Sequence, residues 1–214
     1  MTIAILDFGA QYTKVIDRRV RELKVKSDIL PSNTPAKKLK EYSAIILSGG
    51  PSSVYEKDAP KYDKNMFNLN IPILGICYGM QLMNYACGGQ VESMPKKEYG
   101  ETIVKIKNSQ LFADLSEEQE VLMSHGDSIT AIAPGFHATA HSGNLIAGIE
   151  NTEKKLFGVQ FHPEVDLTRN GRKMLENFLF KVCRLQPDFT LSTRMNETIK
   201  DIQQTVGSKK VLVL

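Results

Sequence analysis

Cys77 is the side chain in this sequence whose surroundings best suit a nucleophile. It stands between Gly75 and Gly79 in a G-x-C-x-G pattern. The apolar run 71–76 indicates a buried strand and residues 78–87 indicate a helix, which places Cys77 on the turn between them. This is the thiol form of the nucleophile elbow, and the N–H groups of the helix N-terminus favour the reactive thiolate. A buried structural thiol is the alternative interpretation of this motif alone.

A cysteine nucleophile needs a base and a group that orients the base, and Phe161-His-Pro-Glu164 contains both residue types. In an extended segment, side chains at i and i+2 point the same way, so His162 and Glu164 can share one face. We expect the preceding strand to be an interior strand that ends beside Cys77. A core histidine followed by a loop carboxylate is the alternative for this segment alone.

Acyl transfer also needs N–H donors for the oxyanion that forms on the reacting carbonyl. Ser48-Gly-Gly-Pro51 follows a predicted strand, where a glycine would let a substrate approach closely. The backbone N–H groups of Gly50 and Tyr78 are the expected pair of donors. An ordinary turn is the alternative for the Gly-Gly-Pro sequence.

Polar residues follow a further apolar strand, in the sequence Ser124-His-Gly-Asp127. Ser124, His125, Gly126 and Asp127 suit recognition of a small charged substrate, and an ordinary turn is again the alternative. His137 and His141 lie on a predicted strand without an evident partner, which favours structural or exposed roles. The sequence contains no cluster with metal-ligand spacing and no phosphate-binding loop, so we expect no metal in these residues.

The elements that would position these residues alternate between strand and helix in the first half of the chain. Strands are expected at 2–8, 26–30, 43–47 and 71–76, and helices at 11–23, 35–40, 59–67 and 78–87. Such alternation predicts a mostly parallel sheet, whose sites lie at the carboxyl ends of the strands. Shorter strands follow at 101–106, 120–123, 137–142, 145–150 and 155–161. The predicted fold class is therefore α/β, a mostly parallel open sheet flanked by helices, with antiparallel excursions.

The end of the chain has a different organisation. A helix over 170–184, with an apolar face of Met174, Leu175, Phe178, Leu179 and Val182, is expected to close a first domain of residues 1–185. Residues 186–214 are then predicted to form a linker, a helix over 195–206 and an apolar strand over 209–214. This region is typical of the beginning of a second domain.

Composition excludes several classes of function. Hydrophobic residues make up 42% of the 214 residues and the net charge is only +3, which argues for a globular chain without a nucleic-acid partner. Neither an export signal nor an apolar run of membrane-spanning length is present, so no membrane partner is expected. Three cysteines without a C-x-x-C pair indicate a reducing, cytoplasmic compartment, in which Cys87 and Cys183 are structural thiols.

Taken together, the four motifs resemble a class I (triad-type) glutamine amidotransferase domain over about residues 2–184, with a flavodoxin-like fold. The resemblance implies a catalytic triad of Cys77, His162 and Glu164, in which the thiol attacks the side-chain amide of L-glutamine. His162 would act as base and then acid, and Glu164 would orient it. Gly50 and Tyr78 would donate N–H groups to the oxyanion. The residues implied to hold glutamine are Gln81, Ser124, His125, Gly126 and Asp127.

Within this family, Asp7-Phe-Gly-Ala-Gln-Tyr12 and the tail over 199–214 resemble the GMP synthases. That resemblance implies ATP-dependent amination of XMP to GMP, in purine nucleotide biosynthesis. ATP and Mg²⁺ would bind an ATP-pyrophosphatase (synthetase) domain that follows in cis and is missing here. These 214 residues would hold no cofactor and would supply only the glutaminase half of the reaction, with weak activity until the synthetase domain docks.

Three alternatives remain open from the sequence. The first is the glutaminase component of another synthetase, such as anthranilate synthase, against which the segment 8–12 and the tail argue. The second is a γ-glutamyl hydrolase on a similar scaffold, which would turn over γ-glutamyl peptides instead of free glutamine. The third is a non-enzymatic module in which Cys77 is only a packing residue.

Overall fold

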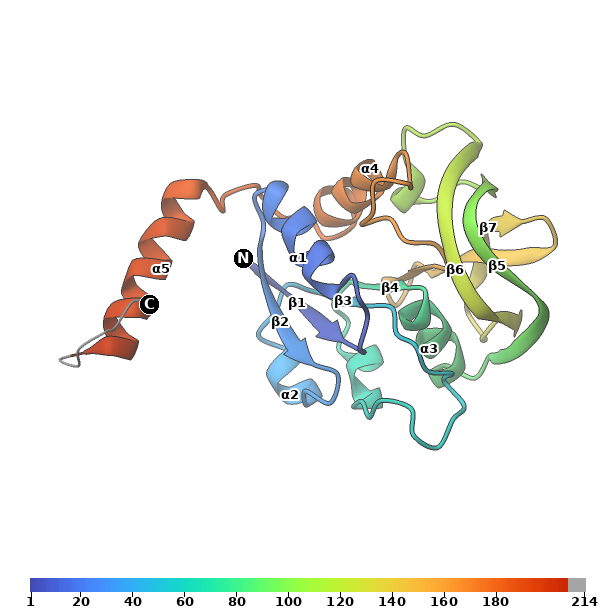
Figure 1. The fold of residues 1–214 in the computed structure, drawn as a ribbon, viewed down its shortest axis with the longest axis horizontal. Helices are drawn as coiled ribbons and strands as arrows, with labels where there is room; N and C mark the ends of the chain where they lie inside the picture. The colour runs from blue at the N-terminus through green and yellow to red at the C-terminus, as the bar shows by residue number, and fades with distance from the viewer. Residues whose placement is uncertain (208–214) are drawn as a thin grey trace.

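The computed structural model describes residues 1–207 and has helices on both faces of one large sheet (Figure 1). The strands are β1 (Thr2–Asp7), β2 (Lys26–Pro31), β3 (Ala44–Leu47), β4 (Ile73–Ile76), β5 (Gln90–Ile106), β6 (Glu118–Ala131), β7 (His137–Ser142), β8 (Leu145–Asn151) and β9 (Leu156–Val159). The α-helices are α1 (Thr13–Glu22), α2 (Ala36–Leu39), α3 (Tyr78–Ala86), α4 (Gly171–Glu176) and α5 (Leu191–Val206). Two 3₁₀ segments, η1 (Lys64–Asn68) and η2 (Gln110–Phe112), and a π-helical segment, η3 (Asn177–Val182), complete the elements.

The sheet has the order β2-β1-β3-β4-β9-β8-β7-β5-β6, and its first five strands are parallel. Side chains of β1 alternate between two cores: Ile3 and Ile5 pack with α1 and α4, whereas Ala4 and Leu6 pack with α2, η1 and α3. Both faces of the parallel strands are therefore covered, which explains why β3 and β4 are continuous apolar runs. The predicted α/β class, with a mostly parallel half and antiparallel excursions, is confirmed.

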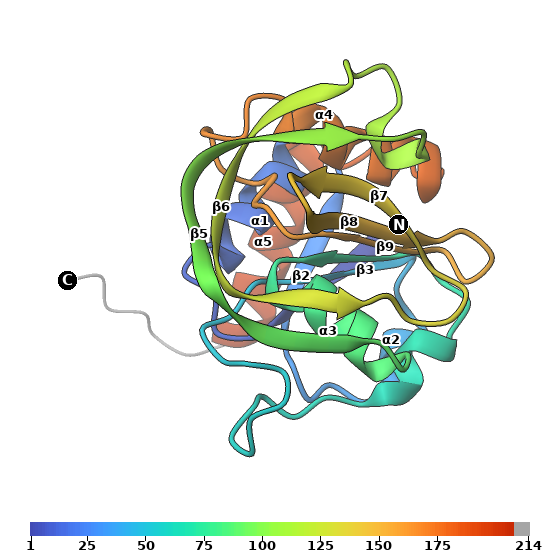
Figure 2. The same cartoon turned by 90° about the vertical axis from the view of Figure 1, so that its right-hand side faces the viewer.

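The antiparallel half is larger than the sequence predicted. β5 and β6 form a long, strongly curved hairpin that wraps around one end of the sheet (Figure 2). The strands predicted over 101–106 and 120–123 are only parts of it, because glycines and charged residues interrupt the alternating pattern elsewhere. The alternative interpretation of residues 124–127 as an ordinary turn was therefore wrong. Ser124, His125 and Asp127 lie within β6, opposite residues of β5.

Two predicted helices differ from the structure. In place of a helix over 59–67 there is a loop followed by η1. This segment begins after Asp63, and the Asp63 side chain accepts hydrogen bonds from the N–H groups of Asn65 and Ala36. The closing helix predicted over 170–184 consists of α4 and the π-helical η3. Of its predicted buried face, Met174, Leu175, Phe178 and Leu179 are buried, whereas Val182 is only partly buried. His137, expected to lack a partner, has its Nε2 3.7 Å from Glu150 Oε1.

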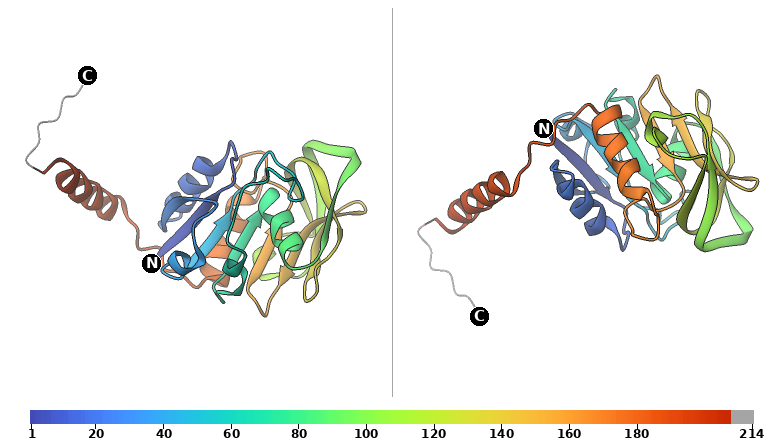
Figure 3. Two further views of the ribbon diagram at one scale, coloured as in Figure 1. Left: turned by 90° about the horizontal axis from the view of Figure 1, so that it is seen from below. Right: turned by 90° about the horizontal axis from the view of Figure 1, so that it is seen from above.

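The helix predicted over 195–206 is part of α5, which projects away from the sheet and its covering helices (Figures 1 and 3). The strand predicted over 209–214 lies outside the described residues, and the division into domains at residue 185 stays a prediction. Within residues 1–207, no helix combines the length and apolar character needed to cross a membrane.

Candidate active site

Cys77 lies on the sharp turn between β4 and α3, as predicted. Its φ of 51° and ψ of −107° are rare for a residue with a side chain and store strain of about 1–3 kcal/mol. The flanking glycines make the turn possible: a Cβ on Gly75 would lie 2.5 Å from the carbonyl oxygen of Gly79, and one on Gly79 would lie 2.5 Å from that of Leu47. The N–H of Cys77 donates to the carbonyl oxygen of Val159 (2.8 Å), which fixes the turn beside the end of β9.

His162 and Glu164 follow β9 and meet as the sequence predicted. His162 Nδ1 lies 2.8 Å from Glu164 Oε1, and the two residues are 5% and 1% exposed. The backbone of His162 is fixed on both sides, since its N–H donates to the carbonyl oxygen of Leu122 and its carbonyl accepts from Thr168 Oγ1 (2.6 Å). Because Nδ1 faces the carboxylate, Nε2 is the ring nitrogen left for the Cys77 side chain, which lines the same pocket.

Opposing effects act on the pKa of His162. Burial lowers it by penalising the charged imidazolium, but hydrogen bonds and charge interactions with Cys77 and Glu164 together raise it to about 10. The net direction is upward, because the interactions with Glu164 and Cys77 outweigh the penalty of burial. The imidazole can therefore hold the proton that leaves the thiol at neutral pH.

Two glutamine side chains support the sulfur. Gln160 Nε2 lies 3.5 Å from Cys77 Sγ, and Gln160 Oε1 accepts from Gln81 Nε2 (3.1 Å). Gln81 Nε2 also donates to the carbonyl oxygen of Asp127 (2.9 Å), and Sγ lies 3.7 Å from the carbonyl oxygen of Ser124. Sequence reasoning missed Gln160, although a polar residue between an apolar strand and His162 was a usable signal.

The two expected oxyanion donors lie on neighbouring turns. Gly50 borders the pocket, and a Cβ added to it would lie 2.7 Å from the carbonyl oxygen of Phe8 and 3.4 Å from Tyr78 Cγ. Ser48 holds the turn, since its Oγ accepts from the N–H of Phe8 and donates to the carbonyl oxygen of Gly49. The Tyr78 side chain points into the core, where burial raises the pKa of its phenol to about 12. The phenol of Tyr78 is thus directed away from the pocket, and only its backbone N–H could act as an oxyanion donor.

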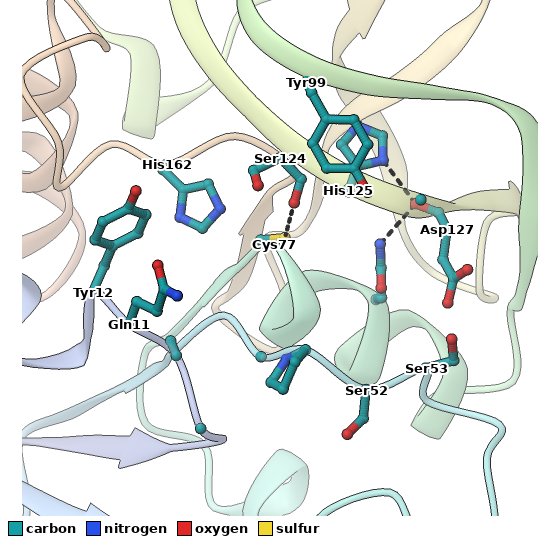
Figure 4. Close-up of a pocket in the computed structure, with 16 residues that line it drawn as sticks. Gln11, Tyr12, Ser52, Ser53, Cys77, Tyr99, Ser124, His125, Asp127 and His162 are labelled. Atoms are coloured by element: carbon teal, nitrogen blue, oxygen red, sulfur yellow. Dashed lines mark hydrogen bonds between the residues drawn. The ribbon is translucent and has the colours of Figure 1, made fainter.

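A pocket of about 430 Å³ opens at Cys77 and brings the four motifs together (Figure 4). This volume is in the range of small-molecule sites. Its lining residues are Gly9, Ala10, Gln11, Tyr12, Gly50, Pro51, Ser52, Ser53, Cys77, Gln81, Tyr99, Ser124, His125, Gly126, Asp127 and His162.

Several lining residues were not among the predicted site residues. Gln11 and Tyr12 follow β1, and the ring of Tyr12 meets that of His162 edge-on at 5.5 Å. Tyr99 comes from β5 and lies across from Ser124 of β6. Asp127 Oδ1 lies 3.3 Å from the hydroxyl of Tyr55. In the described part of the chain, no group of three or more His, Cys, Asp or Glu residues could hold a metal ion.

Comparisons with known proteins agree with the family that the sequence motifs resemble. A family model described as glutamine amidotransferase class-I matches residues 4–182. The chain is 49% identical over 215 residues to a GMP synthase [glutamine-hydrolyzing] of Brachyspira hyodysenteriae, and 50% identical over 230 residues to one of Dictyostelium discoideum. Each match covers 99% of this chain but only 42% and 32% of those relatives, so the chain spans less than half of their length.

Solved structures share the fold. A Thermoplasma acidophilum protein, provisionally described as a GMP synthase subunit, superposes with a TM-score of 0.75 at 27% identity, covering 95% of this chain and 98% of that one. A glutamine amidotransferase from Thermotoga maritima superposes with a TM-score of 0.62 at 23% identity, covering 96% of this chain and 95% of that one, and shows the fold alone. The family model covers most of the chain, and the chain therefore belongs to the class-I glutamine amidotransferase family.

Proposed function

We propose that this chain hydrolyses L-glutamine through a thioester on Cys77. The observation that carries the proposal is the pocket that a thiol on a strained turn shares with a histidine held by a buried carboxylate. The thiolate attacks the side-chain carbonyl carbon of glutamine, while His162 holds the proton from the thiol. His162 then gives that proton to the departing ammonia as the C–N bond breaks. Water, deprotonated by His162, attacks the thioester, which releases glutamate and returns the proton to the thiol.

The remaining predicted site residues have supporting roles in this proposal. The N–H groups of Gly50 and Tyr78 stabilise the oxyanion during both steps, since Tyr78 directly follows Cys77 and Gly50 lines the same pocket as Cys77. Gln81 and the segment 124–127 form the wall of the pocket opposite the turn that carries Gly50. Of these, the Asp127 carboxylate supplies a negative charge for the ammonium group of glutamine.

We further propose that the ammonia serves a GMP synthase. The support is the name shared by the relatives at 49% and 50% identity, together with the larger part of each relative that this chain does not span. A synthetase part in cis would bind ATP, Mg²⁺ and XMP and use the ammonia to form GMP, in the cytoplasm. The glutaminase residues of this chain would then need no cofactor of their own.

Active-site labelling tests the hydrolytic proposal. The chain is treated with 6-diazo-5-oxo-norleucine, an electrophile that mimics glutamine, and the intact mass and modified residue are determined by mass spectrometry. We expect one adduct, on Cys77, that excess glutamine prevents and that excess γ-glutamyl peptide does not. Cys87→Ala is the matched control and should label like the unaltered chain. No labelling, even after addition of the synthetase part, would show that the pocket does not bind glutamine.

A further inference from the structure

A second histidine and carboxylate pair consists of His125, which lines the pocket, and the partly buried Glu98, which does not. Glu98 of β5 and His125 of β6 are directly opposite one another, with Oε2 and Nε2 3.3 Å apart. The side chains are 16% and 4% exposed, respectively. Glu98 Oε1 accepts from Ser142 Oγ at the end of β7 (2.7 Å), so both carboxylate oxygens have partners. The pair thus joins three strands at one point.

The hydrogen bonds determine where the protons are. His125 Nδ1 lies 2.8 Å from the carbonyl oxygen of Asp127, and a carbonyl oxygen can only accept, so Nδ1 carries a hydrogen (Figure 4). Nε2 then faces Glu98 Oε2, and this contact is a hydrogen bond only when one of these two atoms holds a proton. Both ring nitrogens are therefore engaged by the protein, which leaves neither free to bind a substrate.

This pair lies beside an irregularity of the strand ladder. The register of β5 and β6 shifts between the pairs Ser93–Asp127 and Glu98–His125, which flank Gly126 on β6. Yet this stretch of β6 lines the pocket, and the carbonyl oxygen of Asp127 accepts from Gln81 as well as from His125. The ring of His125 thus connects the backbone of this stretch, at Asp127, to Glu98 on β5.

We propose that Glu98 is a positioning residue for glutamine binding. By fixing the ring of His125, it holds the segment 124–127, and through it Gln81, in the shape that accepts the substrate. Glu98 does not line the pocket and has no contact with the Cys77 sulfur or the His162 ring. This inference rests on the proposed hydrolysis of glutamine, and it assigns to His125 a role in shaping the pocket.

Two substitutions of similar size test the proposal. Glu98→Leu removes both hydrogen bonds, whereas Glu98→Gln keeps them, because the amide NH₂ can donate to Nε2 and the amide oxygen can accept from Ser142. The measurement is the glutamine concentration that halves the rate at which methyl methanethiosulfonate modifies Cys77. We expect this concentration to rise at least tenfold in Glu98→Leu and to stay within about threefold in Glu98→Gln. The rate without glutamine should change much less than this concentration, because Glu98 reaches the sulfur only through Ser124 and Gln81.

The controls separate this proposal from a general loss of structure. Glu101→Leu alters an exposed carboxylate on the same strand. Glutamine should protect Cys77 in this variant as well as in the unaltered chain. Ser142→Ala removes one of the two contacts of Glu98 and should raise the half-protecting glutamine concentration about threefold. This variant tests the proposal if Glu98→Leu does not fold. Unaltered protection in both Glu98→Leu and Ser142→Ala would overturn the proposal. So would an equally large change in the rate of Cys77 modification without glutamine, because the effect would then not be on binding. If glutamine fails to protect the unaltered chain, the proposed function itself is wrong.

Discussion

Replacing Glu164 by glutamine should lower the reactivity of Cys77 at neutral pH. Glu164→Gln preserves the size of the side chain and an oxygen that can accept from His162 Nδ1, but it removes the negative charge 2.8 Å from the ring. A buried hydrogen bond to a charged group is worth about 1.5–3 kcal/mol, and each pKa unit corresponds to about 1.36 kcal/mol. The substitution should therefore lower the pKa of His162, now about 10, by roughly 1 to 2.

The sign of the effect follows from where the proton resides. The raised pKa of His162 favours transfer of the thiol proton to the ring. Without the charge of Glu164, this transfer is less favourable by about 1.5–3 kcal/mol, so more of the sulfur keeps its proton at neutral pH. At higher pH the solvent removes it, as in an ordinary thiol with a pKa of about 8.5. The loss of Cys77 reactivity should thus be confined to the lower pH values.

The assay is the rate of Cys77 modification by methyl methanethiosulfonate between pH 6 and 10, followed by intact mass. We expect Glu164→Gln to reduce the rate about tenfold at pH 7 and to approach the rate of the unaltered chain near pH 10. Glu101→Gln, an exposed carboxylate on β5, is the matched control. Equal rates at pH 7, or an equal reduction at every pH, would refute the argument that Glu164 acts through the protonation of His162.

Three further changes test other parts of the argument. Cys77→Ala should abolish glutamine hydrolysis while ammonia-dependent GMP synthesis by the full-length protein continues, and loss of both would contradict the proposed division of labour. Gly79→Ala should lower the free energy of unfolding in urea by about 1–3 kcal/mol, because its Cβ would meet the backbone of Leu47; an unchanged midpoint would mean that α3 can shift. Methyl methanethiosulfonate at pH 7 should modify Cys77 well before Cys87 or Cys183, since burial raises the pKa of both other thiols. Faster modification of either would show that Cys77 is not activated.

Local sequence was sufficient for the parts of the site that are built from neighbouring residues. The turn at Cys77 follows from an apolar run, a helix and two glycines, all within about one element of the residue. The contact between His162 and Glu164 follows from their spacing of two residues. The parallel half of the sheet was likewise predictable, because strands buried on both faces are short, continuous apolar runs.

The curved hairpin was not predictable, although the residues 124–127 that it carries to the pocket were among the predicted site residues. Residues on β5 and β6 face the core at some points and the pocket or solvent at others, so no single period marks the strands. The contacts of Gln160 with Cys77 and of Glu98 with His125 join residues 83 and 27 positions apart.

The sequence therefore determined which residues could react and how each local turn presents them. Only the tertiary structure decided which side chains support them, because strand order and register bring together hydrogen-bonding groups that no local pattern relates. The register shift beside Gly126 shows the physical reason: it depends on how two distant strands pair, and that pairing determines whether Glu98 reaches His125.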